Sequence, residues 1–268
     1  MYEAFYGLSE KPFSIQPDPG FLYFGKRHTL AYSMLEYAIE SQAAFCVITG
    51  DIGCGKTTLI RHLLNELPAK LTVGLVSGLH RETAGVLAWA SLALDLPYDG
   101  WSALALYDAF QRFLIKEYGA GRRVLLIIDE AQSLTEDDLE VLRMLSNINA
   151  DKDQLLQIIL VGQTQFRDML QRPEMQQFAQ RIAVHFHLPP LEPDEVETYI
   201  QRRLAQAGKT DTLFSASACQ RIAAASRCVP RGINILCDTA LVYGFSGEAS
   251  QIDEGIVEDV ISDKAQYG

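Results

Sequence analysis

The glycine-rich segment GDIGCGKT at residues 50–57 constrains this chain more than any other feature. It fits the pattern G-x-x-x-x-G-K-[ST], follows the apolar run FCVIT and opens the helical run TLIRHLLNEL, which is the context that the pattern requires. Its glycines let the backbone curl so that successive N–H groups point at one anion, assisted by the positive end of the next helix. A turn that binds nothing is disfavoured because strand, spacing and the Lys-Thr pair occur together.

The residues of this segment are expected to bind a nucleoside triphosphate. Lys56 is expected to reach the β and γ phosphates, and the Thr57 hydroxyl to hold Mg²⁺. The predicted binding residues are Gly50, Asp51, Ile52, Gly53, Cys54, Gly55, Lys56, Thr57 and Thr58.

A second apolar run, VLLIIDE at residues 124–130, ends in two acids and predicts the other half of the site. Asp129 would hold the metal through its water shell. Glu130 would polarise a water for in-line attack on the γ phosphate, which favours hydrolysis over transfer to another acceptor. The alternative is a strand that ends in a solvated Asp-Glu turn.

Short apolar runs alternate with helical patterns through the first two thirds of the chain. The runs are 45–49, 71–76, 124–128, 158–161 and 183–188, and the clearest helices are 29–39, 84–96, 103–118 and 137–148. Buried strands separated by helices indicate an α/β fold, a P-loop NTPase with a five-stranded parallel sheet sandwiched by helices.

The pattern changes after Pro189-Pro190, where three or four amphipathic helices are predicted. They cover residues 194–207, 215–226, 232–245 and 253–263, with Ser215 and Asp253 as N-caps and Gly208 as a C-cap. We therefore expect an aromatic and proline-rich arm at 1–28, a P-loop ATPase domain at 29–190 and a small helical lid domain at 191–268.

Composition narrows the functional classes. With 23 Lys and Arg against 34 Asp and Glu, the formal charge of -11 gives no global attraction for nucleic acid or anionic lipid. The 5 cysteines lack disulfide or zinc spacing, and no apolar run reaches the length of a membrane helix. A cytoplasmic protein is expected, or one held at a membrane through a partner.

Taken together, the motifs resemble the AAA+ ATPases, and among them the ExeA/GspA-like secretion ATPases. The segments that carry the resemblance are, in family order, FYGLSEKPFSIQPDPGFLYFGKRH, TGDIGCGKTTL, LLIIDEAQSL, ILVGQ, QRIAVHFHLPPL and VPRGINILCDTAL. The same core is similar to ATPases of MSHA-pilus and exosortase loci and, more distantly, to TnsC/TniB-type transposition regulators.

The resemblance implies three further site residues. Gln163 would be the first sensor, where most relatives carry Asn, Ser or Thr, and Thr164 is a possible substitute. Arg181 would be an arginine finger supplied to a neighbouring subunit, with Arg172 and Arg167 as competitors. Arg231 would be the second sensor, bringing the lid onto the γ phosphate. The alternatives are that Gln163 is a glutamine at a strand end with no role in the reaction, and that Arg181 and Arg231 are ordinary solvated arginines at helix ends.

These observations predict an ATP-hydrolysing enzyme, with ATP and Mg²⁺ as cofactors, that works as a ring or hexamer. The expected client is a secretion or pilus machinery of the envelope, reached through a membrane partner. The chain ends at the lid, so it is either a short relative or truncated. The alternative function is a DNA-binding regulator of transposition, which the charge of -11 disfavours. A small-molecule kinase is a third possibility.

Overall fold

The computed structural model describes residues 1–78, 84–150 and 153–267. The chain forms two compact units. One consists of Leu30–Asp51 and Leu63–Leu188, and the other of Met1–Thr29, Ile52–His62 and Pro189–Gly268. The domain boundaries expected after residues 28 and 190 stay a prediction.

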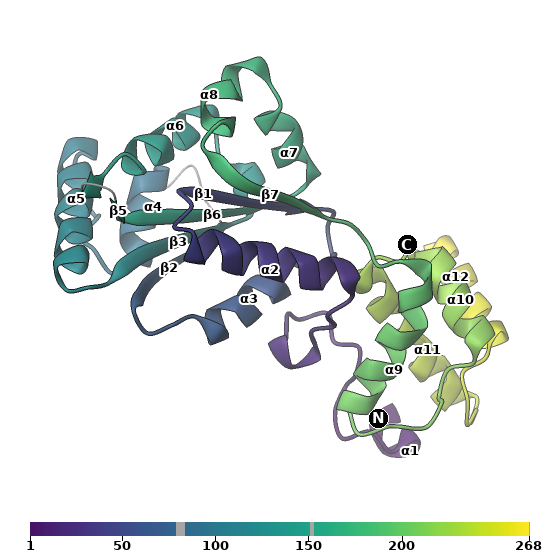
Figure 1. Cartoon of the computed structure of the whole chain (residues 1–268). Coiled ribbons are helices and arrows are strands. Elements are labelled where there is room, and N and C mark those ends of the chain that lie inside the picture. Colours follow the sequence, from purple (N-terminus) through teal and green to yellow (C-terminus); the bar gives the residue numbers. More distant parts are fainter. Residues whose placement is uncertain (79–83, 151–152, 268) are drawn as a thin grey trace. The chain divides into compact units, whose positions relative to one another are not determined.

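The first unit is built on a parallel sheet of five strands in the order β2-β3-β6-β1-β7 (Figure 1). The strands are β1 (Phe45–Gly50), β2 (Leu71–Ser77), β3 (Arg123–Asp129), β6 (Leu156–Gly162) and β7 (Ile182–Leu188). Every residue of β1 and β6 is buried, whereas the edge strands β2 and β7 are partly exposed. The predicted α/β fold with a five-stranded parallel sheet is confirmed.

Helices cover both faces of this sheet (Figure 1). The helices of this unit are α2 (Lys26–Glu40) from Leu30 onward, α4 (Val86–Ala93), α5 (Ala103–Gly119), α6 (Glu136–Leu145), α7 (Thr164–Leu170) and α8 (Gln176–Ala179). Helix α3 (Lys56–Glu66) belongs to the other unit as far as His62. Helices α4, α5, α6, α7 and α8 share one apolar core with one face of the sheet. On the other face, the Gln157 side chain donates to the Ala38 carbonyl of α2 at 3.1 Å.

Several local elements differ from the sequence prediction. Helices α7 and α8 and the small antiparallel pair β4 (Asn149–Ala150) and β5 (Asp153–Gln154) were not predicted. Seven and four residues are too few to show a helical period. Helix α6 begins earlier than predicted because Thr135 and Asp138 form a capping box around its first turn.

The second unit contains the C-terminal helices α9 (Val196–Gln206), α10 (Ala216–Ser226), α11 (Pro230–Ser246) and α12 (Glu254–Tyr267). Their predicted caps are present. Ser215 accepts from the Ala218 N–H at 3.1 Å, Asp253 accepts from the Ile256 N–H at 3.0 Å, and Gly208 has a φ of +87°.

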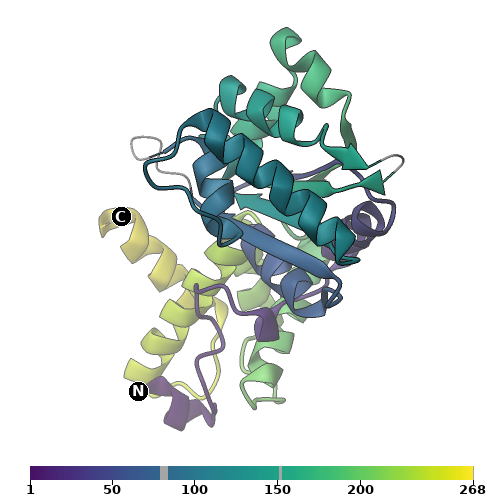
Figure 2. The ribbon, with the colours of Figure 1, turned by 90° about the vertical axis from the view of Figure 1, so that its left-hand side faces the viewer.

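The N-terminal arm packs on these helices (Figure 2). It contains the short helix α1 (Tyr2–Tyr6), which sequence reasoning did not predict, and a 3-10 turn, η1 (Pro19–Phe21). Phe13 meets Phe214 edge to face at 5.9 Å, and the Arg203 guanidinium donates to the Pro12 carbonyl at 2.6 Å. Burial of its rings thus fixes the arm. In the described parts of the chain, no helix has the length and apolarity needed to span a membrane.

A buried carboxylate fixes the turn between α5 and β3. Arg122 donates two hydrogen bonds of 2.7 Å to Glu117, and the Thr72 hydroxyl of β2 donates a third. Chiefly through the Arg122 bonds, the pKa of Glu117 falls to about 2. The charged carboxylate therefore stabilises the fold above its unfolded pKa, and this contribution is lost as the pH falls toward 2.

We expect Glu117→Gln to lower the thermal midpoint near neutral pH by about 3 to 6 °C, because the amide cannot replace the charge-assisted bonds to Arg122. The deficit should shrink as the pH approaches 2, where the wild-type carboxyl is protonated as well. Melting curves across this range test it. The exposed Glu174→Gln is the control, and a deficit that does not depend on pH would contradict the assignment.

Candidate ATP site

The glycine-rich segment lies where the chain leaves β1 and enters α3. A side chain at Gly50 would collide with the Leu188 carbonyl, and Gly53 and Gly55 have φ angles of +84° and +93°. Positive φ angles favour glycine, so the backbone of the loop itself requires glycine at these positions. Lys56 and Thr57 follow in the first turn of α3, where the N–H groups and the helix dipole favour an anion.

Helix α11 contacts this loop through its first turn. The Arg231 N–H donates to the Gly53 carbonyl at 3.1 Å, and a Cβ built on Gly53 would lie 2.5 Å from the Arg231 Cβ. Pro230 at the start of α11 is buried, while the Arg231 side chain is exposed. The predicted second sensor therefore lies against the loop, with its guanidinium open to solvent.

His28 is a loop contact that sequence reasoning missed. Its ring is only 3% exposed, and Nε2 lies 2.9 Å from the Cys54 carbonyl. Because a carbonyl only accepts, Nε2 carries the proton, and among the described residues Nδ1 has no hydrogen-bond partner. Burial lowers the pKa of His28, against the raising effects of the Cys54 carbonyl and Glu195. The neutral ring is thus a fixed donor to the phosphate loop.

The two predicted acids lie at the end of β3. Asp129 is buried, and its carboxylate accepts from the Glu130 N–H at 2.9 Å. Glu130 is exposed and left-handed, with a φ of 59°, a conformation that costs a non-glycine residue energy and is common at functional sites. The strand therefore ends in a sharp turn that separates a buried acid from an exposed one.

Gln163 and Gln132 surround the Glu130 carboxylate. The Gln163 amide donates to Glu130 Oε2 at 3.2 Å, and the Gln132 amide donates to the same oxygen. The Gln163 N–H in turn donates to Gln132 Oε1 at 3.0 Å. The structure thus brings the predicted base and the predicted first sensor together. Gln132 was missed because the sequence marks it only as the last residue of DEAQ.

Thr164, the substitute considered for the sensor, makes a different contact. Its hydroxyl donates to Asp51 Oδ1 at 2.6 Å. Asp51 belongs to the predicted binding segment, so this bond ties the start of α7 to the beginning of the phosphate loop.

The three candidate finger arginines have different surroundings. Arg181 is half-buried, and its guanidinium donates to the Ser146 hydroxyl at 3.3 Å. Arg172 is exposed and pairs with Glu136 at 3.4 Å, and Arg167 lies 3.6 Å from Asp168. Each contact is within the chain, and the choice of Arg181 stays a prediction.

The residues proposed for Mg²⁺ fit that ion chemically. The Thr57 hydroxyl and the Asp129 carboxylate are hard oxygen donors, the kind that Mg²⁺ takes together with water and phosphate oxygens. Asp129 is 7% exposed, and buried carboxylates are rare unless they are paired, hydrogen-bonded or bound to a metal.

The chain is similar to known proteins in sequence. An AAA domain family matches residues 39–170. General secretion pathway protein A of Aeromonas hydrophila is 38% identical over 256 residues, which are 95% of this chain and 47% of that protein. The chain thus spans about half the length of this curated relative.

Solved structures share the fold at lower identity. The ORC2 protein of Aeropyrum pernix in its ADP form has a TM-score of 0.67 and 20% identity, covering 94% of this chain and 71% of its own. The Walker-type ATPase of Pyrococcus abyssi has 0.64 and 15%, covering 95% and 76%. The RuvB Holliday junction branch migration motor of Thermotoga maritima has 0.58 and 19%, covering 89% and 69%.

Fold, phosphate loop and family match together define this chain as an AAA+ ATPase. The secretion-pathway relative matches nearly the whole chain. Within the AAA+ ATPases, the chain is an ExeA/GspA-like member, as the motifs indicated. The curated match does not favour a transposition regulator.

We expect His28→Ala to weaken ATP binding by about five- to tenfold, because the Cys54 carbonyl loses its donor and the loop loses its support. His28→Gln should retain most of the affinity, since its amide nitrogen can replace Nε2 as the donor. Titration with a fluorescent ATP analogue measures both. Equal affinities for wild type and His28→Ala would contradict the role.

Proposed function

We propose that this protein hydrolyses ATP to ADP and phosphate, and that an oligomer of it uses the cycle to drive assembly or remodelling of a secretion-type envelope machinery. The observation that carries the hydrolysis is the Glu130 carboxylate, held by two glutamine amides at the end of β3, in a chain whose β1 leads into a phosphate-binding loop. The similarity to general secretion pathway protein A supports a secretion machinery as the target of the ATPase.

Each residue has a defined part in this reaction. The loop N–H groups and Lys56 bind the phosphates and neutralise the charge that develops on them. Glu130 accepts a proton from the water whose oxygen attacks the γ phosphorus, while the bond to the β–γ bridging oxygen breaks and ADP leaves. Gln163 and Gln132 keep the carboxylate in place. Thr57 and Asp129 would hold Mg²⁺, which would supply charge stabilisation on the phosphate oxygens.

The contact between α11 and the loop supports a role for Arg231 as nucleotide sensor. Because its N–H is bonded to the Gly53 carbonyl, a change in loop conformation on hydrolysis alters a hydrogen bond at the start of the helix. The exposed guanidinium is free to meet the γ phosphate. We infer that this is how hydrolysis is coupled to movement of the C-terminal helices.

Two variants separate binding from chemistry. Lys56→Ala should weaken ATP binding more than tenfold, because the main phosphate cation is lost. Glu130→Gln should bind ATP within about twofold of wild type and release phosphate about 100-fold more slowly, because the amide cannot take a proton. Calorimetry and a phosphate-release assay measure the two effects. The exposed Glu174→Gln is the matched control, and a Glu130→Gln variant as fast as wild type would refute the base assignment.

A trans-acting finger predicts an oligomer-dependent rate. We expect phosphate release per subunit to rise with protein concentration, and Arg181→Ala to bind ATP normally but hydrolyse it about 10³-fold more slowly. Arg172→Ala is the control, because this side chain is 58% exposed and already paired. Oligomer mass is measured on the same samples. A full rate in Arg181→Ala, or a rate independent of concentration, would exclude the finger.

A further inference from the structure

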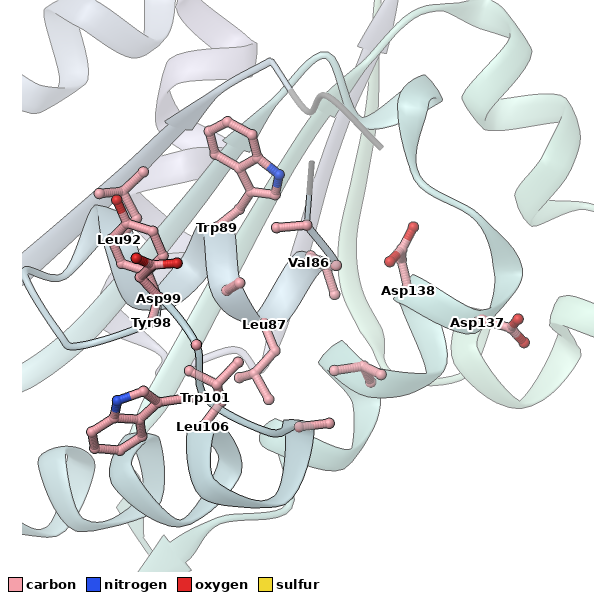
Figure 3. A pocket seen from close by; sticks show the side chains of 16 residues that line it. Val86, Leu87, Trp89, Leu92, Tyr98, Asp99, Trp101, Leu106, Asp137 and Asp138 are labelled. Atoms are coloured by element: carbon pink, nitrogen blue, oxygen red, sulfur yellow. The ribbon is translucent and has the colours of Figure 1, made fainter. Parts of the chain in front are cut away.

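A pocket of about 830 Å³ lies in the sheet-containing unit (Figure 3). It is lined by α4, the connection from α4 to α5, the first turn of α5 and the first turns of α6. None of the residues assigned above to ATP binding or hydrolysis lines it. Its volume is in the range of sites that bind drug-sized ligands or several side chains.

Aromatic side chains dominate one side of this pocket. The chain has 2 tryptophans, and both of them, Trp89 and Trp101, line the pocket together with Tyr98. Trp101 is 45% exposed, Tyr98 is 41% exposed and the neighbouring Leu92 is 45% exposed. Single exposed apolar residues are ordinary, but a cluster around a cavity marks an interaction site, and Trp and Tyr are the residues enriched in binding hot spots.

Hydrogen bonds restrain the backbone of the connection from α4 to α5, which carries Tyr98 and Trp101. The Leu96 N–H donates to the Ser91 carbonyl at 2.9 Å, and the Trp101 N–H donates to the Tyr98 carbonyl at 3.5 Å. Ser102 then caps α5. A turn whose backbone is restrained at both ends lowers the ordering cost of binding a ligand on its aromatic rings.

Among the described residues that line the pocket, the side chains charged at neutral pH are all acidic, namely Asp99, Asp137 and Asp138. Figure 3 shows Asp137 and Asp138 on the side opposite the aromatic rings. Asp138 bonds Thr135, whereas Asp99 and Asp137 are exposed and form no ion pair with any residue that the structure describes. Such a rim attracts cations and repels phosphate groups and anionic lipid.

We propose that this pocket is a docking groove for a helical segment of a partner protein that carries large apolar side chains on one face beside Lys or Arg. The apolar face would lie on the tryptophans and the basic groups on the carboxylates, the arrangement of a helix in a groove. A second copy is a poorer occupant because each chain has a charge of -11. The proposal is independent of ATP hydrolysis.

Selection from a phage-displayed library of random peptides tests the groove directly. Wild-type protein is immobilised, and soluble Trp101→Ala is added in excess to remove peptides that bind elsewhere. Surviving sequences should carry large apolar residues at helical spacing next to Lys or Arg. Synthetic peptides of these sequences should shift the tryptophan fluorescence saturably, because both tryptophans line the groove.

Variants then localise the binding. Trp101→Ala should weaken it about tenfold or more, and Tyr98→Ala provides a second test if that variant folds poorly. Asp137→Asn should weaken it about threefold at low salt and less at high salt. Leu104→Ala, 79% exposed on the same helix as the lining residues of α5 but outside the lining, should bind as wild type.

Several results would overturn the proposal: no peptide survives the competition, the survivors are acidic, or Leu104→Ala and Trp101→Ala weaken binding equally. Wild-type self-association that Trp101→Ala abolishes would show that a second copy fills the groove, and would also overturn it.

Discussion

The phosphate loop depends on backbone contacts from segments far away in the sequence. The Gly53 carbonyl accepts from the first turn of α11, and the Cys54 carbonyl accepts from His28. These two hydrogen bonds support the curled backbone of the loop. Residues 52–62 belong to one compact unit with the N-terminal and C-terminal segments for this reason. The glycines permit the curl, and these neighbours fix its shape.

The other half of the site depends on a strained residue. Glu130 takes a left-handed conformation immediately after a fully apolar strand, and two amides then fix its carboxylate. The strain costs free energy, which the buried residues of β3 on both sheet faces offset. As a result, neighbouring acids have different surroundings: Asp129 is closed off, as suits a metal ligand, and Glu130 is open to water.

The sequence predicted the fold because its strongest signals are local. Five apolar runs and the glycine pattern specify the parallel sheet, and Ser215 and Gly208 mark helix ends through their own capping chemistry. His28 and Gln132 gave no such signal, since their importance comes from contacts formed only after folding. The groove around Trp101 was missed for the same reason, because an aromatic residue in a turn has no period to read.

Charge explains how one acidic chain can select two opposite kinds of ligand. A protein with a charge of -11 and a pI of about 4.9 repels a triphosphate at long range. Loop N–H groups, the end of α3 and Lys56 act only at contact distance, where oriented donors outweigh the screened field of distant carboxylates. At the groove the net charge favours binding, because the acidic rim and the negative charge of the whole chain both attract a basic partner. The nucleotide is therefore selected by short-range geometry, and the partner by long-range attraction followed by aromatic contact.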